Sequence, residues 1–343
     1  MTTRIAGCGS DGNSKMILIL SNKWDLSIDF VVKELRKREY PFLRINTEDL
    51  PSGRATVNLP DMHIFVSKQG NTYDLTKNVK VIWNRRPGKP YDDTPLEDRP
   101  TPAIQRFVND QWYSWLEALQ LLPDVTWINH PRANDVMESK IRQLWYASKI
   151  GFRIPKTVIS NDPDRIRTEL ETFDNKMITK ALFSPLIEEQ EKDYFIFTNE
   201  INEIAKKDDD RIRLSPCIFQ ESITPKTDYR VTVIGDTVIP VKIETEVPSQ
   251  AALDWRTQKD GLKFTPCNLA DDIEKLCRAF VKDNGLLFGA IDLVECNGEF
   301  VFLEINPNGE WGWLQKPNGL PIAETLCDLM IFYDNHKGKS HET

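Results

Sequence analysis

The sequence contains no long apolar run, no paired cysteine motif and no excess of positive charge. No apolar segment approaches the ~20 residues of a membrane span, so we expect no membrane partner. The six cysteines form no CxxC pair and no metal-ligand spacing, which favours reduced thiols in a cytoplasmic protein. The net charge of −8 and the pI near 5.3 argue against nucleic acid as the main partner, although a local basic pocket is allowed.

Patterns of nucleophilic catalysis are also absent. No Ser/His/Asp or Cys/His arrangement is present, and no role is assigned to the four histidines. The Met-Thr-Thr-Arg start lacks the apolar core of a signal peptide. Residues 1–15 are rich in glycine and serine, so we expect a flexible leader there.

The first part of the chain alternates strands and helices. At 343 residues the sequence has enough material for two or three domains. Strands at 16–21 and 42–46 flank a helix that starts near Ser27, which is a βαβ opening. A hairpin region near 55–75, the strand VKVIW and a helix at 103–122 complete the predicted α/β domain.

Arg85 and Arg86 directly follow the strand VKVIW. Open α/β sheets bind ligands at the carboxyl ends of their strands, so both arginines are candidate ligand contacts. The alternative is a solvated basic turn.

Two further units with strands and helices follow. We expect a helix from about Asn134 to Ile150, with Lys140 on it. The strand KMITKAL places Lys180 between apolar neighbours, and a helix is expected over 199–207. In the last unit, Asp228 and Arg230 share a face of the strand DYRVTVIG, and Lys242 points away from the apolar side of TVIPVKIETE.

The chain is organised around residues 289–311, GAIDLVECNGEFVFLEINPNGEW. Two strand-like runs flank the turn dipeptide Asn297-Gly298, and each run carries one acid, Asp292 or Glu304. A carboxylate among Ile, Leu, Val and Phe is costly to bury unless a cation or a hydrogen-bond donor meets it. We therefore expect a positive partner for these acids.

The turn decides whether the two acids share a face. A two-residue loop pairs Asp292 with Leu303 and places Glu304 on the other face. A three-residue loop pairs Asp292 with Phe302, and then Asp292, Glu304 and Asn306 lie on one face. We favour the three-residue loop or an equivalent bulge, because it gathers oxygen ligands that magnesium prefers. The alternative is two solvent-facing acids on an edge hairpin.

Taken together, these residues resemble the ATP-grasp ligase superfamily over about 129–329, and EINPNGEW with the Asp of GAIDL is the most specific part. RRP at 85–87, DYRVTVIG, DWR at 254–256 and INPNGEWGWL resemble the microviridin-type peptide macrocyclases, the graspetide synthetases. The resemblance implies a chain of α/β and α+β class with the ATP-grasp fold. The expected domains are an N-terminal pre-ATP-grasp α/β domain at 16–128, a central ATP-grasp subdomain at 129–215 and a C-terminal one at 216–343.

The resemblance also implies ATP and Mg²⁺ as cofactors and a role for each candidate residue. The nucleotide contacts would be Lys140 and Lys180 at the phosphates, Gln220, Glu221 and Ile223 at adenine, and Asp228 at the ribose. The metal ligands would be Asp292, Glu304 and Asn306, with Arg230 and Lys242 facing the phosphoryl group. One departure concerns ALFSPLIEEQEKDYF after Lys180, which contains no glycine, whereas many ATP-grasp ligases cover the phosphates there with a glycine-rich loop.

An acceptor carboxylate beside the γ-phosphate needs an additional positive group, because both are anions. Arg256 is the first candidate, and Arg85 and Arg86 are the others. Asp254, like Arg85 and Arg86, is a predicted substrate contact. The alternative for Arg256 is a rim arginine paired with Asp254 in solvent.

The implied activity is ATP-dependent macrocyclisation in RiPP biosynthesis. Asp or Glu carboxylates of a ribosomal precursor peptide, with a leader and an acidic core, would become acyl phosphates, and a hydroxyl or Lys amine would then form an ester or amide crosslink. Such phosphoryl transfer needs cations and positioning rather than a nucleophilic side chain. The resemblance also implies a homodimer. The alternatives are a carboxylate–amine ligase acting on a small molecule or protein terminus, and a non-catalytic ATP-binding scaffold.

Overall fold

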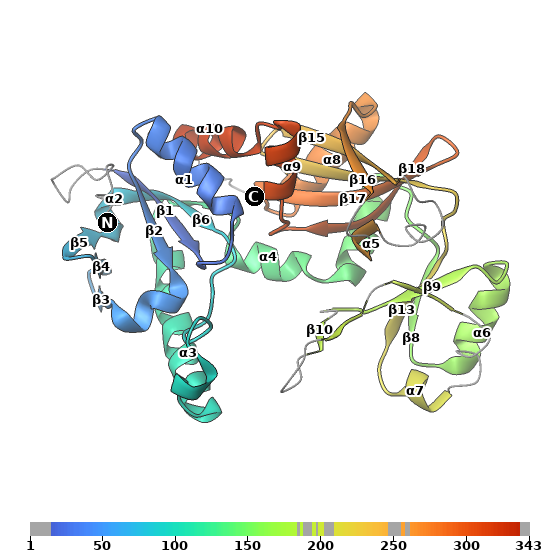
Figure 1. Cartoon of the computed structure of the whole chain (residues 1–343), viewed down its shortest axis with the longest axis horizontal. Coiled ribbons are helices and arrows are strands. Elements are labelled where there is room, and N and C mark those ends of the chain that lie inside the picture. Colours follow the sequence, from blue (N-terminus) through green and yellow to red (C-terminus); the bar gives the residue numbers. More distant parts are fainter. Residues whose placement is uncertain are drawn as a thin grey trace. The chain divides into compact units, whose positions relative to one another are not determined.

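The chain divides into two units (Figure 1). One unit comprises Met1–Pro131 and Glu310–Thr343, and the other comprises Arg132–Gly309. The leader expected at 1–15 lies outside the described residues apart from Lys15. The computed structural model describes residues 15–183, 186–187, 194–196, 198–201, 209–245, 255–257 and 261–336.

A four-stranded parallel sheet forms the centre of the first unit. Its order is β2 (Phe42–Asn46), β1 (Met16–Ser21), β6 (Val79–Asn84) and β7 (Thr126–Ile128). Every residue of β1 is buried, as expected for the apolar run MILIL in a sheet covered on both faces. The strands predicted at 16–21 and 42–46 are confirmed at the same residues.

Helices and a small sheet complete the first unit. The helix predicted near Ser27 is α1 (Ser27–Lys37), whose apolar residues Ile28, Val31, Val32 and Leu35 are buried. The predicted hairpin region is a three-stranded antiparallel sheet of β3 (Arg54–Asn58), β4 (His63–Lys68) and β5 (Asn71–Asp74). The other helices are α2 (Leu75–Asn78), α3 (Pro102–Glu117), α9 (Gly312–Asn318) and α10 (Ile322–Asn335). No helix in the described segments is both long enough and apolar enough to cross a bilayer.

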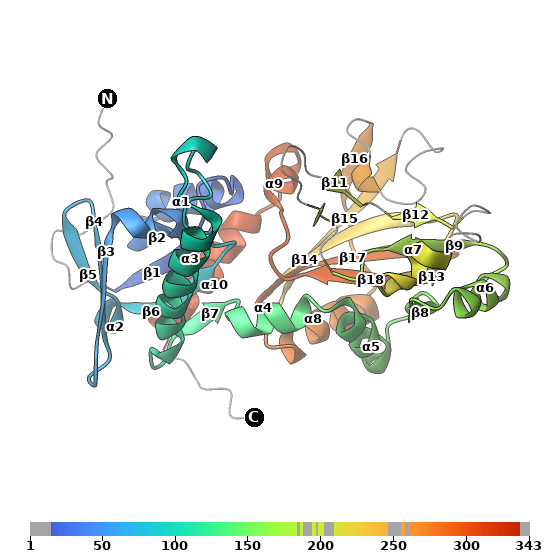
Figure 2. The ribbon, with the colours of Figure 1, turned by 90° about the horizontal axis from the view of Figure 1, so that it is seen from below.

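The end of the chain belongs to this first unit, which differs from the predicted boundaries. We expected residues 216–343 to form one subdomain, but α10 packs against α1, β1 and β6 (Figures 1 and 2). Its buried side chains include Ile322, Leu326 and Met330. The apolar face of α10 therefore completes the core around the parallel sheet.

The second unit contains a small antiparallel sheet with the order β12 (Asn199–Glu200), β9 (Met177–Lys180), β13 (Cys217–Glu221) and β8 (Thr157–Ser160). The prediction of a helix over 199–207 is wrong for its first two residues, which form β12 and pair with β9. Residues 202–208 lie outside the described residues. The remaining elements of this part are α6 (Pro163–Thr172), α7 (Asp209–Arg213), β10 (Leu186–Ile187) and β11 (Tyr194–Phe195).

A larger antiparallel sheet has five strands. Its order is β16 (Leu262–Pro266), β15 (Thr237–Thr245), β14 (Thr227–Ile234), β17 (Phe288–Cys296) and β18 (Glu299–Asn306). One face packs on α5 (Lys140–Ile150) and α8 (Asp271–Asp283), and Phe280 stacks on Phe302 with ring centroids 4.9 Å apart. Because side chains alternate along a strand, the other face is left for polar residues.

The single helix expected over 134–150 is two helices. α4 (Pro131–Met137) ends before Glu138, and α5 begins at Lys140. Ser139 is the N-cap of α5, and its hydroxyl accepts a hydrogen bond from the backbone N–H of Arg142. The break makes Lys140 the first residue of α5 and brings the end of α4 beside it.

Candidate active site

The hairpin of β17 and β18 places its two acids directly opposite each other. Asn297 and Gly298 form a two-residue turn and both have positive φ, 54° and 81°. The predicted three-residue turn is therefore wrong. However, a bulge at Leu303 shifts the register, so that Asp292 pairs with Glu304. The predicted shared face is confirmed by this equivalent bulge.

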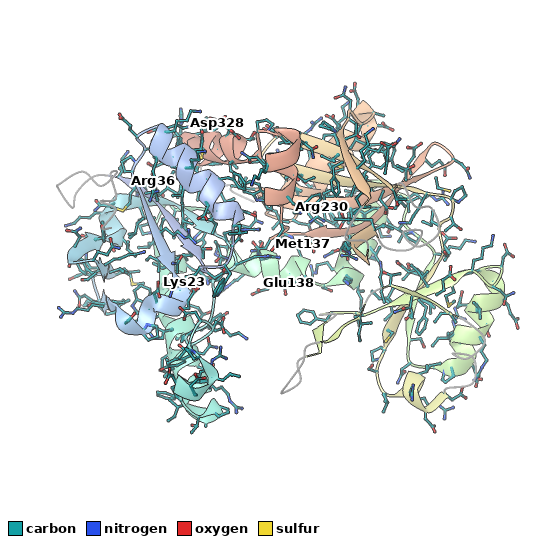
Figure 3. The ribbon with its side chains drawn as sticks, viewed as in Figure 1. Lys23, Arg36, Met137, Glu138, Arg230 and Asp328 are labelled. Carbon is teal, nitrogen blue, oxygen red and sulfur yellow. The ribbon has the colours of Figure 1, made fainter. Side chains whose placement is uncertain are left out.

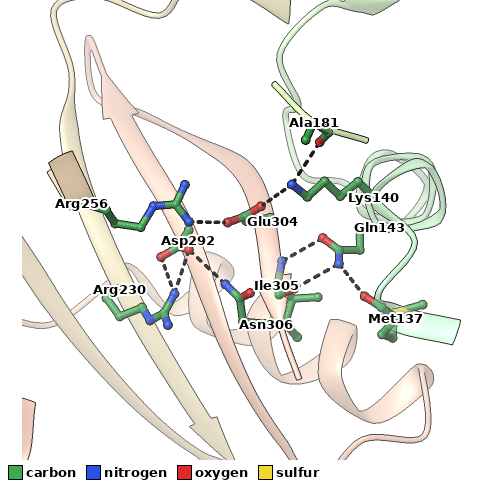
Figure 4. A network of polar contacts seen from close by, with 10 residues as sticks. All are labelled: Met137, Lys140, Gln143, Ala181, Arg230, Arg256, Asp292, Glu304, Ile305 and Asn306. Carbon is green, nitrogen blue, oxygen red and sulfur yellow. Dashed lines mark hydrogen bonds and ion pairs between the residues drawn. The ribbon is translucent and has the colours of Figure 1, made fainter. Parts of the chain in front are cut away.

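Positive side chains meet both buried acids, as the sequence predicts (Figure 4). Asp292 is 7% exposed, and Arg230 Nη1 donates to its two oxygens at 2.9 and 2.8 Å. Glu304 is 9% exposed, with Arg256 Nη1 at 3.2 Å from Oε1 and Lys140 Nζ at 3.7 Å from Oε2. Each acid is thus compensated by at least one cation. Arg230, on β14, is also labelled in Figure 3.

The two carboxyl groups have opposite pKa shifts. Burial raises the pKa of Asp292, Arg230 opposes this shift, and the neighbouring Glu304 adds to it. Burial also acts to raise the pKa of Glu304, but the positive charges of Arg256 and Lys140 outweigh it and hold that pKa at about 2. Glu304 is therefore ionised at neutral pH.

The donor set around the hairpin fits a magnesium ion. Within the described segments, no group of three or more His, Cys, Asp and Glu side chains is placed to hold a metal. The predicted set instead has two acids and Asn306, whose Nδ2 lies 3.4 Å from Asp292 Oδ2. Magnesium prefers oxygen ligands and is usually held by one or two carboxylates while keeping several waters. Asp292, Glu304 and Asn306 satisfy that requirement.

One pocket brings together most of the predicted residues. Its walls come from α5, β9, β13, β14, β17, β18 and the short 3-10 helix Trp255–Thr257. These elements are far apart in sequence, so their convergence is a property of the fold. The predicted residues that line the pocket are Lys140, Lys180, Gln220, Glu221, Ile223, Asp228, Arg256, Asp292 and Glu304.

Three of the predicted nucleotide contacts also bond within the protein. Gln220 Nε2 donates to Thr157 Oγ1 at 2.9 Å, and Glu221 Oε1 accepts from the Lys156 backbone N–H at 3.0 Å. Lys226 Nζ contacts both oxygens of Asp228, at 2.6 and 2.8 Å. These bonds fix the side chains in the pocket wall, so a ligand meets an ordered surface.

The prediction that Lys242 faces the same group as Arg230 is wrong. Arg230 pairs with Val241, whereas Lys242 pairs with Tyr229, whose ring packs in the core on the helix-covered face. Neighbouring positions on a strand point to opposite faces. Lys242 Nζ instead lies 2.9 Å from Glu244 Oε1, outside the pocket.

The predicted substrate contacts are not gathered in this pocket. Arg85 belongs to the first unit, is 1% exposed and lies with Nε 2.7 Å from Asp25 Oδ2, and burial lowers its pKa to about 10. A side chain this buried cannot grip a peptide, which corrects the prediction for Arg85. Arg86, also in the first unit, is half-exposed and pairs with Glu310. Asp254 lies outside the described residues.

Sequence reasoning missed several residues of the site. Trp255 and Lys226 line the pocket, and Gln143 bonds to the backbone of β18. Lys226 could have been found, because positions 226, 228 and 230 are two residues apart and therefore point to the same side of an extended chain. Gln143 follows Lys140 by one helical turn, but no local pattern shows that its partner lies on β18.

Gly309 occupies a position where a Cβ does not fit. An added Cβ would lie 2.5 Å from Ala290 Cβ and 3.0 Å from Arg230 Nη2. Gly309→Ala should therefore lower the free energy of unfolding by ~1–3 kcal/mol, because overpacking displaces its neighbours. Urea unfolding measures the change. Gly53→Ala is the control, since its nearest neighbour would be 3.5 Å away; equal losses in the two variants would contradict the steric explanation.

Comparison with solved structures shows which proteins share the fold of this chain. No family model matches the chain. The macrocyclase MdnC of Microcystis aeruginosa MRC, solved with the precursor peptide MdnA, is 22% identical with a TM-score of 0.81, over 92% of this chain and 99% of that one. A RiPP-associated ATP-grasp ligase of Chryseobacterium gregarium, solved with ADP and a leader and core peptide, is 24% identical with a TM-score of 0.82, over 94% of this chain and 99% of that one.

A sequence relative with another substrate also matches. The tetrahydromethanopterin:alpha-L-glutamate ligase of Methanocaldococcus jannaschii is 24% identical over 216 residues, which cover 60% of this chain and 70% of the relative. The predicted ATP-grasp fold is confirmed by the two structures.

Proposed function

From the ATP-grasp fold of this chain, we propose that it is an ATP-dependent, ADP-forming ligase that crosslinks side chains of a ribosomally made precursor peptide. The observation that carries the proposal is one pocket lined by the predicted phosphate, adenine and ribose contacts together with Asp292 and Glu304, two of the three predicted metal ligands. Two proteins of the same fold, solved with peptides, support the substrate class.

The charges around Glu304 suit a polyphosphate ligand. Lys140, Lys180, Arg230 and Arg256 all act to lower its pKa, so four cations surround two acids. ATP brings negative charge that Lys140 and Lys180 can bind. The lining of the whole pocket carries as many acids as cations, and the cations gather around Glu304.

The charged residues around Glu304, together with Asn306, then have tasks in carboxylate activation. Lys140 and Lys180 bind the phosphates, and Arg256 holds the acceptor carboxylate through parallel hydrogen bonds. Asp292, Glu304 and Asn306 would hold magnesium, which when bound would neutralise phosphate charge. Arg230 orients Asp292 through its two contacts.

The chemistry proceeds in two balanced steps. A carboxylate oxygen of the peptide attacks the γ-phosphorus, the bond to the bridging oxygen breaks, and ADP leaves. A Ser or Thr hydroxyl or a Lys amine then attacks the acyl carbon, loses its proton to solvent and displaces phosphate. The net change in the peptide is the loss of one water for each ring.

Mass spectrometry tests this proposal. The protein, Mg-ATP and the precursor peptide encoded beside its gene are incubated together, and the intact peptide mass is compared before and after. We expect loss of whole water masses with formation of ADP. An unchanged peptide and no ADP, from protein that binds ATP, would support a non-catalytic scaffold instead.

A carboxylate–amine ligase is the second candidate. The observation that favours it is the match to the tetrahydromethanopterin:alpha-L-glutamate ligase. The same experiment separates the two, since ligation adds the mass of an amine substrate less one water, whereas cyclisation only removes water.

Lys180→Met should weaken ATP binding by at least ~10-fold, because one charge-assisted contact to phosphate contributes about 1.5–3 kcal/mol. Methionine keeps the length of the stem and removes only the ammonium group. Titration with ATP measures the dissociation constant. Lys149→Met is the control, because Lys149 lies on α5 over the Trp145 ring and outside the pocket. Identical constants for Lys180→Met and the parent would make Lys180 a structural lysine.

A further inference from the structure

Gln143 joins three separate parts of the second unit by its side-chain amide (Figure 4). It lies on α5 and is 3% exposed. Its Nε2 donates to the carbonyl oxygen of Met137, at the end of α4, and to the carbonyl oxygen of Ile305 at 3.0 Å. Its Oε1 accepts from the backbone N–H of Ile305, also at 3.0 Å. A buried amide with these bonds has a fixed orientation.

The amide completes the edge of the large sheet. β18 is an edge strand, so the outward N–H and C=O groups of its backbone lack a partner within the sheet. At Ile305 the Gln143 amide supplies one acceptor and one donor, as a neighbouring peptide group would. At Phe302 the backbone N–H of β18 likewise donates a hydrogen bond outside the sheet, to the carbonyl oxygen of Arg153 at 2.9 Å.

Ile305 is the residue between two of the predicted metal ligands. Glu304 and Asn306 flank it on β18, on the face opposite the core into which Ile305 packs. Gln143 is also one helical turn from Lys140, whose Nζ lies 3.7 Å from Glu304 Oε2 and 3.3 Å from the carbonyl oxygen of Ala181. One amide therefore ties the helix that carries the lysine to the strand that carries the acids.

We propose that Gln143 is a positioning residue that sets the separation between Lys140 and the magnesium ligands Glu304 and Asn306. This inference rests on the proposed function. Without the amide, the edge of β18 loses its link to α5 while the apolar core beneath it remains. Residues that orient metal ligands without touching the metal commonly change metal affinity by about 10–100-fold when they are replaced.

The test compares Gln143→Met, which keeps the length but removes the polar atoms, with Gln143→Asn, which keeps an amide that is too short to reach. The control is Gln315→Met, because Gln315 in the first unit likewise accepts from a backbone N–H, that of Ala323 at 2.8 Å. Calorimetric titration with ADP at increasing Mg²⁺ gives the magnesium concentration for half-maximal binding. We expect at least a ~10-fold increase in both Gln143 variants and no change in the control.

Hydrogen exchange provides a readout without nucleotide or metal. The Ile305 amide should exchange faster in Gln143→Met, whereas the Phe302 amide, held by Arg153, should keep its protection. A wild-type protein without magnesium-dependent ADP binding would overturn the proposed function itself. Normal wild-type binding together with unchanged magnesium midpoints or unchanged Ile305 exchange in the variants would overturn only the role of Gln143.

Discussion

Replacing Glu304 by Gln is expected to reduce magnesium-dependent ATP turnover by roughly 100-fold or more while the fold stays intact. The substitution keeps the shape of the side chain but removes a negative charge that is ionised at neutral pH in the parent. A hard cation loses an anionic ligand, and removing one preorganised charged or polar group from a site commonly costs this much. ADP release at limiting magnesium measures the effect.

Glu295→Gln is the matched control for this prediction. Glu295 lies on the same hairpin, but it accepts a hydrogen bond from the Tyr229 hydroxyl at 2.8 Å and is not part of the pocket. Turnover in this variant should stay close to that of the parent. If Glu304→Gln also retained full turnover at limiting magnesium, the hairpin acids would not hold the metal.

Arg256→Ala should reduce peptide crosslinking by at least ~10-fold and leave ATP binding nearly unchanged. The structure places Arg256 in the pocket, with Nη1 3.2 Å from Glu304 Oε1. From there its planar group can hold an acceptor carboxylate, and one charge-assisted hydrogen bond contributes ~1.5–3 kcal/mol. ATP affinity and single-turnover crosslinking are measured on the same variant.

Arg153→Ala is the control for this prediction, because it removes an exposed arginine ion pair that lies outside the pocket. The Arg153 side chain is 46% exposed and pairs with Glu299, and the Arg256 side chain is 44% exposed. Exposed pairs contribute little, so Arg153→Ala should crosslink at the parent rate. Equal rates for parent and Arg256→Ala would exclude Arg256 as the clamp and make Arg86 the next residue to test.

Local sequence patterns predicted the elements of the site well. The turn dipeptide Asn297-Gly298 and the alternating runs beside it placed both acids on a hairpin. The shared face of Asp292 and Glu304 was also predicted, because it gathers with Asn306 the oxygen ligands that magnesium prefers. The bulge at Leu303, which brings the two acids to one face, was not predicted. A bulge depends on how β18 packs against its neighbours and not only on the residues of β18.

Contacts between distant elements escaped prediction. Lys242 alternates correctly on its own strand, but its face relative to Arg230 depends on the pairing of β14 with β15. Gln143 and α10 show the same limit, because the partners of Gln143 lie on β18 and those of α10 in the first unit. The break between α4 and α5 was missed although Ser139 is a good N-cap residue, since Glu138 and Ser139 also tolerate a continuous helix.

The most direct test of carboxylate activation follows an oxygen atom. The precursor peptide is prepared with heavy oxygen in its Asp and Glu carboxylates and crosslinked with Mg-ATP. Passage through an acyl phosphate predicts that each ring releases one ADP and one inorganic phosphate carrying one heavy oxygen from the peptide. Phosphate without the label, or AMP and pyrophosphate in place of ADP and phosphate, would contradict the proposed activation in this pocket.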